Sequence, residues 1–224
     1  MNSILQQPEK RIALRFFAWF LRRFFDLLYH QFSWAYDFVA WTVSLGLWKD
    51  WVISVIPYLH DGTVLELGHG PGHLQFALHQ AGKRCFGLDQ SKQMSSQARR
   101  RLKRSGLPAN LLRARTEKLP LPSNSIPQIV ATFPSEYISD KDTLAEMYRV
   151  LLPGSSAVVL LLAWITGKSI LERLAAWLFQ VTGETPVWKD QFLNPARAAG
   201  FIVQSEFITF PTSKLLIVQL CKPN

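Results

Sequence analysis

The stretch that most constrains the fold is residues 64–73, which read Val-Leu-Glu-Leu-Gly-His-Gly-Pro-Gly-His. Its first four residues form a largely apolar run with the length of a buried strand, and a helical pattern begins at Leu74. Three glycines alternate between the two, and glycine lets backbone N–H groups come close to a ligand. The positive end of the following helix dipole points to the same place. The stretch therefore predicts a strand, a ligand-binding turn and a helix in an α/β fold.

The spacing of the glycines is G-x-G-x-G, whereas dinucleotide-binding proteins use G-x-G-x-x-G for a pyrophosphate. Glu66 precedes the first glycine, where its charge would repel a phosphate and favour a cationic ligand. Asp89 ends the next predicted strand, about twenty residues further on, where a carboxylate binds ribose hydroxyls. S-adenosyl-L-methionine (SAM) has a ribose, a sulfonium and an ammonium group, so it fits this pattern. The same spacing disfavours a nicotinamide-dependent oxidoreductase.

Four segments, in the right order, resemble motifs of the class I SAM-dependent methyltransferases. Residues 64–72 resemble motif I, and residues 87–89 resemble the second motif of the family. Residues 119–122 resemble the "LPF" stretch before the fourth strand, and residues 146–154 resemble the "RVLKPGG" segment before the fifth. Together the four segments extend the resemblance over residues 60–222, which is most of the chain.

The resemblance implies an α/β fold with a seven-stranded, Rossmann-like sheet of order 3-2-1-4-5-7-6, the last strand antiparallel, and helices on both faces. It also implies an N-terminal helical appendage at 1–59 and a SAM-binding domain at 60–224. The elements expected from periodicity and turn residues are helices at 74–80, 92–104, 141–152, 170–180 and 191–199, and strands at 63–67, 84–88, 111–113, 128–132, 157–164, 201–209 and 215–221. We expect the helix at 141–152 to end at Pro153 and Gly154.

The resemblance also implies which residues hold the cofactor. The expected SAM-binding residues are Tyr36, Glu66, Gly68, His69, Gly70, Gly72, Asp89, Gln90, Thr116, Glu117, Thr132 and Phe133. Two positions depart from the family pattern. Arg115 stands where an aspartate commonly contacts the adenine amine, which leaves a backbone contact from Thr116, and Pro127 stands in place of the aspartate before the fourth strand. These departures leave open a protein that binds SAM without catalysis.

As an enzyme, the chain is expected to be a SAM-dependent methyltransferase. Methyl transfer is an in-line displacement that depends mainly on orientation and exclusion of water, so it needs no catalytic triad. A general base is needed for a phenol or an activated ring carbon but not for a neutral amine. The candidates for this role are His69, Glu136 and Tyr137.

No metal site is expected. His69, His73 and His79 lie close together in the sequence, but no carboxylate or cysteine accompanies them at the spacing of metal ligands. The two cysteines, Cys85 and Cys221, fall in predicted strands and are interpreted as buried, reduced thiols.

Residues 11–28 form a predicted amphipathic helix with arginines on one side and phenylalanines and leucines on the other. Four arginines disfavour a transmembrane span, and no cleavage site of a signal peptide follows. A cationic helix of this kind is typical of a segment that lies in a membrane interface. The alternative is a helix that packs on the domain itself or against a second subunit, which leaves a homo-oligomer open.

Residues 36–49 resemble the N-terminal helices of ubiquinone/menaquinone-biosynthesis C-methyltransferases and of bacterial phospholipid N-methyltransferases. That likeness implies that Tyr36 faces the cofactor, although aromatic residues at this spacing are usually core. The favoured acceptor is small, hydrophobic and membrane-associated: a quinone precursor or an aminophospholipid. A soluble hydrophobic metabolite is the second candidate. We expect a cytoplasmic protein, peripheral at the inner face of the membrane.

The formal net charge of +9 points to an anionic partner. Many of the cations fall in the predicted helix 92–104, whose charged side is either a solvated surface or a phosphate-binding face for nucleic acid or lipid. No aromatic residues alternate with them, and no nucleic-acid-binding motif is present, so nucleic acid is disfavoured as a substrate.

Overall fold

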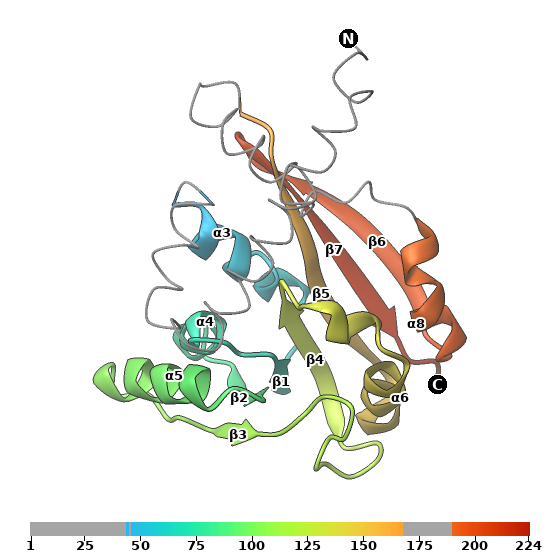
Figure 1. Cartoon of the computed structure of the whole chain (residues 1–224), viewed down its shortest axis with the longest axis horizontal. Helices are drawn as coiled ribbons and strands as arrows, with labels where there is room; N and C mark the ends of the chain where they lie inside the picture. Colours follow the sequence, from blue (N-terminus) through green and yellow to red (C-terminus); the bar gives the residue numbers. More distant parts are fainter. Residues whose placement is uncertain (1–43, 45, 168–189) are drawn as a thin grey trace, which may run out of the picture.

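The computed structural model describes residues 44, 46–167 and 190–224. Within them, seven strands form a sheet of order β3-β2-β1-β4-β5-β7-β6 (Figure 1). The strands are β1 Thr63–Leu67, β2 Arg84–Asp89, β3 Leu111–Arg113, β4 Ile126–Thr132, β5 Leu151–Ile165, β6 Ile202–Thr209 and β7 Ser213–Cys221. β1 to β5 pair in parallel, and β7 runs antiparallel to both of its neighbours. The predicted strand order and the antiparallel last strand are confirmed.

Helices cover both faces of the sheet, again as predicted (Figure 1). The helical elements are α3 Trp48–Ile53, η3 Ile56–Tyr58, α4 His73–Gln80, α5 Lys92–Arg104, η4 Glu136–Ser139, α6 Lys141–Val150, η5 Asp190–Leu193 and α8 Asn194–Ala198. Ser91 accepts a hydrogen bond from the Met94 N–H at 3.3 Å, which explains why α5 begins at Lys92.

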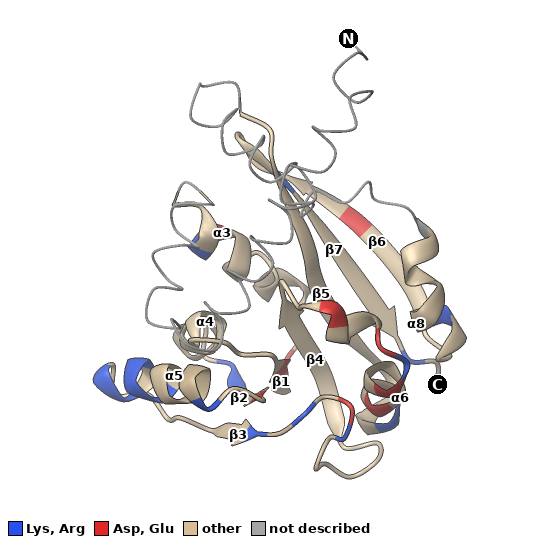
Figure 2. Cartoon of the chain, in the orientation of Figure 1, with Lys and Arg blue, Asp and Glu red and all other residues tan. Residues whose placement is uncertain are grey.

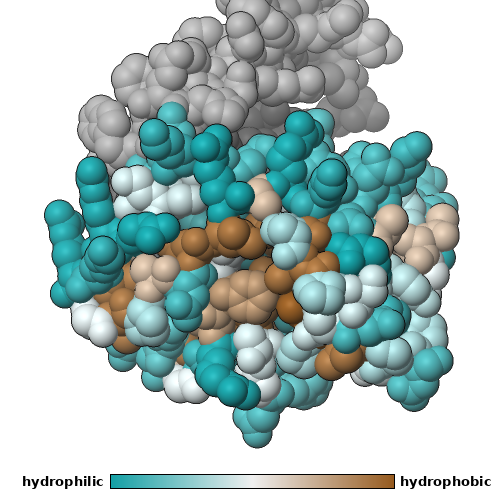
Figure 3. Space-filling view, turned by 90° about the horizontal axis from the view of Figure 1, so that it is seen from below, coloured by the Kyte–Doolittle hydropathy of each residue, from teal (hydrophilic) through white to brown (hydrophobic). Residues whose placement is uncertain are grey.

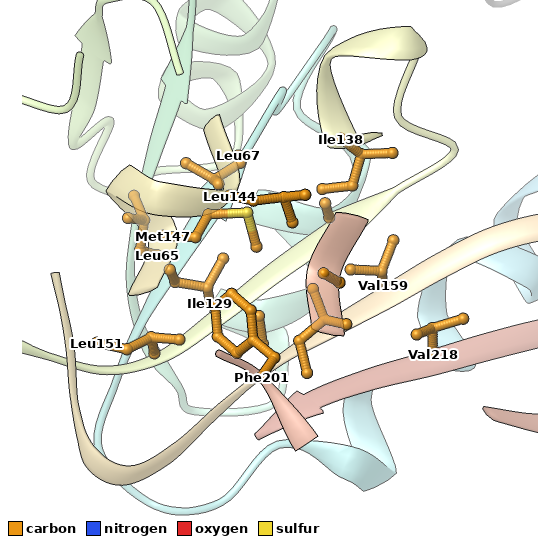
Figure 4. Packing of buried hydrophobic residues seen from close by; sticks show 14 of the residues in the cluster. Leu65, Leu67, Ile129, Ile138, Leu144, Met147, Leu151, Val159, Phe201 and Val218 are labelled. Carbon is orange, nitrogen blue, oxygen red and sulfur yellow. The ribbon is translucent and has the colours of Figure 1, made fainter. Parts of the chain in front are cut away.

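Alternating side chains of the strands supply two hydrophobic cores. Val64 and Val130 pack with α3 and α4 on one face of the sheet. Leu65 and Ile129, their neighbours in the chain, pack with α6 and α8 on the other face, and Figure 4 shows this second core. Since α3 contributes the fully buried Trp51 to the first core, part of the predicted appendage 1–59 packs directly on the sheet.

Two predicted helices end or begin differently in the structure. The helix expected at 141–152 ends at Val150, because Leu151 already pairs with Ile126 of β4 and the following residues belong to β5. The helix expected at 191–199 is a 3-10 turn, η5, followed by the short α8, with Pro195 in the first turn of α8. The predicted helices at 11–28 and 170–180, and Tyr36, lie outside the described residues.

The two cysteines are free thiols in strands, as predicted: Cys85 is buried in β2 and Cys221 is half-buried in β7. Burial raises the pKa of the Cys85 thiol to about 12. None of the described helices has the length and hydropathy that crossing a membrane requires.

Candidate active site

A cavity of about 310 Å³ opens at the carboxyl ends of β1, β2 and β4. Ligands bind at this edge in open α/β sheets. Nine of the residues singled out in the sequence line it: Gly68, Gly70, Asp89, Gln90, Thr116, Glu117, Thr132, Phe133 and Tyr137. Others that line it were not predicted: Leu88, Ser91, Met94, Ala114, Pro134 and Ser135. Ser91 and Met94 follow Asp89 so closely that their position beside the cavity could have been foreseen.

Asp89 is held at the cavity wall by two backbone groups. The Gly70 N–H donates to Asp89 Oδ2 at 2.9 Å, and the Ser91 N–H donates to Asp89 Oδ1 at 2.7 Å. A carboxylate has about four acceptor sites, so each oxygen retains one for a ligand. The side chain is therefore fixed in place and still able to accept two hydrogen bonds from a pair of neighbouring hydroxyls.

The glycines of the loop have different structural roles. Gly68 has φ +69°, and a Cβ added there would lie 2.5 Å from the hydroxyl oxygen of Tyr137. That hydroxyl donates to the Leu67 carbonyl at 3.1 Å, so it is fixed close to the loop. At Gly72 an added Cβ would lie 2.8 Å from Cβ of Ala98, so this glycine permits close packing of α5 and does not line the cavity.

We expect Gly68→Ala to destabilise the fold and the ligand site more than Gly70→Ala. Both glycines have positive φ, which costs about 1 kcal/mol or more for alanine. Only position 68 adds a clash with Tyr137, because nothing lies within 4 Å of a Cβ at Gly70. Thermal unfolding of the two variants measures the difference, and equal melting temperatures would contradict the clash.

Glu66 is fully buried and lies behind the glycine loop. Gln75 of α4 donates to its carboxylate, Nε2 to Oε2, at 2.8 Å. Burial raises the pKa of Glu66 to about 8, and the charge of Asp89 adds to this effect. The carboxylate faces α4 and is not part of the cavity wall, so the structure does not support the expected direct contact with a cationic ligand.

Two of the three base candidates are also absent from the cavity wall. His69 is buried, with Nδ1 2.8 Å from the Gly70 carbonyl oxygen and its ring packed against Gly87. Burial lowers the pKa of His69, so its imidazole is neutral near pH 7. Glu136 is exposed on η4. Tyr137 lines the cavity, but its hydroxyl already donates to the Leu67 carbonyl.

Arg115, which stands where the family commonly has an aspartate, does not line the cavity. Arg115 is exposed and donates to Glu117, Nη2 to Oε1, at 2.8 Å. This pairing lowers the pKa of Glu117, which lines the cavity as a carboxylate. Thr116 is buried beside it, with Oγ1 3.1 Å from Oγ1 of Thr143 in α6.

Phe133 forms an aromatic wall with α3. It has φ +47°, which is rare for a residue other than glycine and concentrates at functional sites. Its ring stacks on Trp48, with centroids 4.6 Å apart, and lies 6.1 Å from the ring of Trp51. Trp51 Nε1 donates to Ser213 Oγ at 2.9 Å inside the core. Trp51 is a core residue, whereas Trp48 is half-buried against a residue of the cavity wall.

Comparison with known proteins agrees with this geometry. Residues 64–154 match the family model of a methyltransferase domain. Over 158 residues the chain is 32% identical to the ubiquinone/menaquinone biosynthesis C-methyltransferase of Escherichia coli. These matches support a class I SAM-dependent methyltransferase. The aligned region covers 66% of this chain and 61% of that relative, so the chain spans about three fifths of the length of the curated relatives that it matches.

Solved methyltransferases share the fold. Haemonchus contortus phosphoethanolamine N-methyltransferase 2, in complex with S-adenosylhomocysteine, superimposes with a TM-score of 0.59 at 15% identity over 80% of this chain and 53% of that one. Geranyl diphosphate C-methyltransferase from Streptomyces coelicolor superimposes with a TM-score of 0.57 at 11% identity over 78% and 79%. SAM is thus the cofactor expected for this methyltransferase chain. Among the residues that the structure describes, no group of three histidine, cysteine or acidic side chains is placed to hold a metal ion.

Proposed function

We propose that the chain transfers the methyl group of SAM to a small, hydrophobic, membrane-associated acceptor of the quinone-precursor type. The observation that carries the proposal is the Asp89 carboxylate, which two backbone N–H groups fix at the cavity wall beside the glycine loop. The acceptor sites that remain on the Asp89 carboxylate fit the ribose hydroxyls of SAM. Gly68 and Gly70, which have a left-handed backbone conformation and no side chain, leave the loop backbone open to the rest of the cofactor.

The described residues have separate tasks in this mechanism. SAM, when bound, supplies the electrophilic methyl group. Asp89 accepts hydrogen bonds from the ribose hydroxyls, and Glu117 and Thr116 line the same cavity nearby. Thr132 and Phe133, at the end of β4, form the wall on the α3 side, where an apolar surface excludes water and orients the acceptor. An acceptor of the quinone-precursor type also has to lose a proton, and none of the described residues is assigned as the base that takes it.

The nature of the acceptor is inferred from three observations. The curated relative is named for ubiquinone and menaquinone biosynthesis. The Phe133–Trp48 stack offers an aromatic wall against which a ring can pack. The amphipathic pattern of residues 11–28 suits a protein that is peripheral at the inner face of a membrane, with 1–59 as the appendage and 60–224 as the SAM domain. An aminophospholipid and a soluble metabolite are the competing acceptors.

The test uses SAM with a labelled methyl group. The protein is incubated with a total membrane-lipid extract and, separately, with the soluble metabolite pool. We expect the label in the lipid extract, in a product without a phosphate headgroup. Label in a phospholipid would replace the quinone-type acceptor by an aminophospholipid, and label only in the soluble pool would contradict the membrane-associated acceptor. SAM binding without any labelled product would favour a non-catalytic SAM-binding protein.

A further inference from the structure

The exposed side of helix α5 carries only positive charges. Its buried side, Met94, Ala98 and Leu102, packs on the domain at a spacing of four residues. The cations of the exposed side are Lys92, Arg99, Arg100, Lys103 and Arg104, which we call the α5 basic face. The sequence contains no acidic residue between Asp89 and Glu117, so the helix carries no internal counter-charge.

None of the described residues forms an ion pair with the α5 basic face. Ion pairs between described residues join Lys83 to Asp61, Arg115 to Glu117 and Arg149 to Glu146, and none of them involves this face. In Figure 2 much of the ribbon of α5 is blue, the colour of Lys and Arg, and no part of this helix is red. Arg101 differs from the five, because it donates to the Pro71 carbonyl of the glycine loop.

We propose that the α5 basic face binds an anionic lipid surface. A helix lying along such a surface brings all of its exposed cations to headgroup level, and each one adds to the attraction. In Figure 3, hydrophilic side chains likewise project at the left, the side that α5 occupies in Figure 1.

The same helix argues against single-stranded nucleic acid as the partner. Such binding combines basic side chains with aromatic rings on which bases stack. The stretch between Asp89 and Glu117 contains no aromatic residue. An anionic lipid surface can be bound through positive charge alone, and the α5 basic face supplies that charge.

Binding through α5 would also place the cofactor cavity close to the lipid. Ser91 and Met94, at the start of the helix, line that cavity. Since a helix rises 1.5 Å per residue, the last cation, Arg104, lies about 20 Å further along the axis. The cavity would thus be held near a surface from which a hydrophobic acceptor can enter. Vesicle binding requires no turnover, so this inference stands or fails independently of the proposed activity.

The test is co-sedimentation of the full chain with vesicles of phosphatidylcholine alone or mixed with phosphatidylglycerol, at one ionic strength. The test variant is Arg100→Gln/Lys103→Gln/Arg104→Gln. The matched variant, Lys49→Gln/Lys118→Gln/Lys141→Gln, removes three exposed cations from other elements, so both variants lose the same net charge. We expect the α5 variant to lose roughly tenfold or more in affinity for the anionic vesicles, and the matched variant to lose less than about threefold. Unchanged melting temperature and SAM affinity show that the α5 variant is folded.

Three outcomes would overturn the inference. Equal losses in the two variants would mean that net charge, and not the α5 basic face, determines binding. Equal sedimentation with neutral and anionic vesicles would exclude an electrostatic contact. Tighter binding of the wild-type chain to an RNA or DNA oligonucleotide than to anionic vesicles, lost in the α5 variant, would assign the face to nucleic acid.

Discussion

Replacing Asp89 by alanine is expected to weaken SAM binding by about 100-fold or more. The variant removes two hydrogen bonds from the ribose to a charged acceptor, each worth about 1.5–3 kcal/mol. It also removes the acceptor of the Gly70 and Ser91 N–H groups, so the loop loses the contacts that fix its position. Isothermal titration with SAM measures the affinity, and methyl transfer is expected to fall with it.

Two further variants make this result interpretable. Asp61→Ala removes a carboxylate that is fully exposed and 3.4 Å from Lys83, so it should leave SAM affinity unchanged. Asp89→Asn keeps the size of the side chain and one acceptor oxygen, but its NH2 group cannot accept from the second backbone N–H or from a ribose hydroxyl, so we expect a substantial loss that is smaller than that of alanine. SAM affinity that survives in a folded Asp89→Ala variant would show that the ribose binds elsewhere.

The order of the strands was predictable only through the resemblance to the class I methyltransferases, whereas the outline of the cofactor site follows from local patterns. Alternating glycines after an apolar run, and an acid at the end of the next strand, place Gly70 and Asp89 at one edge of a parallel sheet, and the structure joins them at 2.9 Å. The helical periodicity likewise predicted both ends of α5, which Ser91 caps in the structure.

The direction of the Glu66 side chain follows from the alternation of side chains along β1. In a strand, residues two apart share a face. Glu66 therefore shares its face with Val64, which packs under α4, and its carboxylate points to Gln75. The predicted contact with a cationic ligand rests on the charge of Glu66 and not on this alternation.

Other features of the site depend on tertiary contacts between distant residues. His69 is buried because Gly87, eighteen positions away, lacks a side chain at the point of contact. The stacking of Phe133 on Trp48 joins the end of β4 to α3 across 85 positions. No periodicity or spacing in one sequence predicts such a pair.

Stability is expected to fall between pH 6.5 and 8 because of Glu66. Its pKa is raised from 4.5 to about 8 in the folded chain, so the folded state keeps a proton that the unfolded state has released. The contribution of Glu66 to the free energy of unfolding is fully present below pH 4.5 and is lost as the pH rises through 8. Across this window the free energy of unfolding should fall by between about 1.5 and 2 kcal/mol.

Glu66→Gln should remove this dependence on pH. The amide is neutral throughout and retains an oxygen that accepts from Gln75, so the variant should match or exceed the stability of the wild type at pH 8. The other shifted groups act on both proteins alike: the lowered pKa of His69 has a small effect of opposite sign near pH 6.5, and the raised pKa of Cys85 acts mainly above pH 9. Urea unfolding at pH 6.5 and 8 measures the difference, with the exposed Glu136→Gln as control. If the wild type and Glu66→Gln lose stability in parallel, the proton that folding retains is not on Glu66.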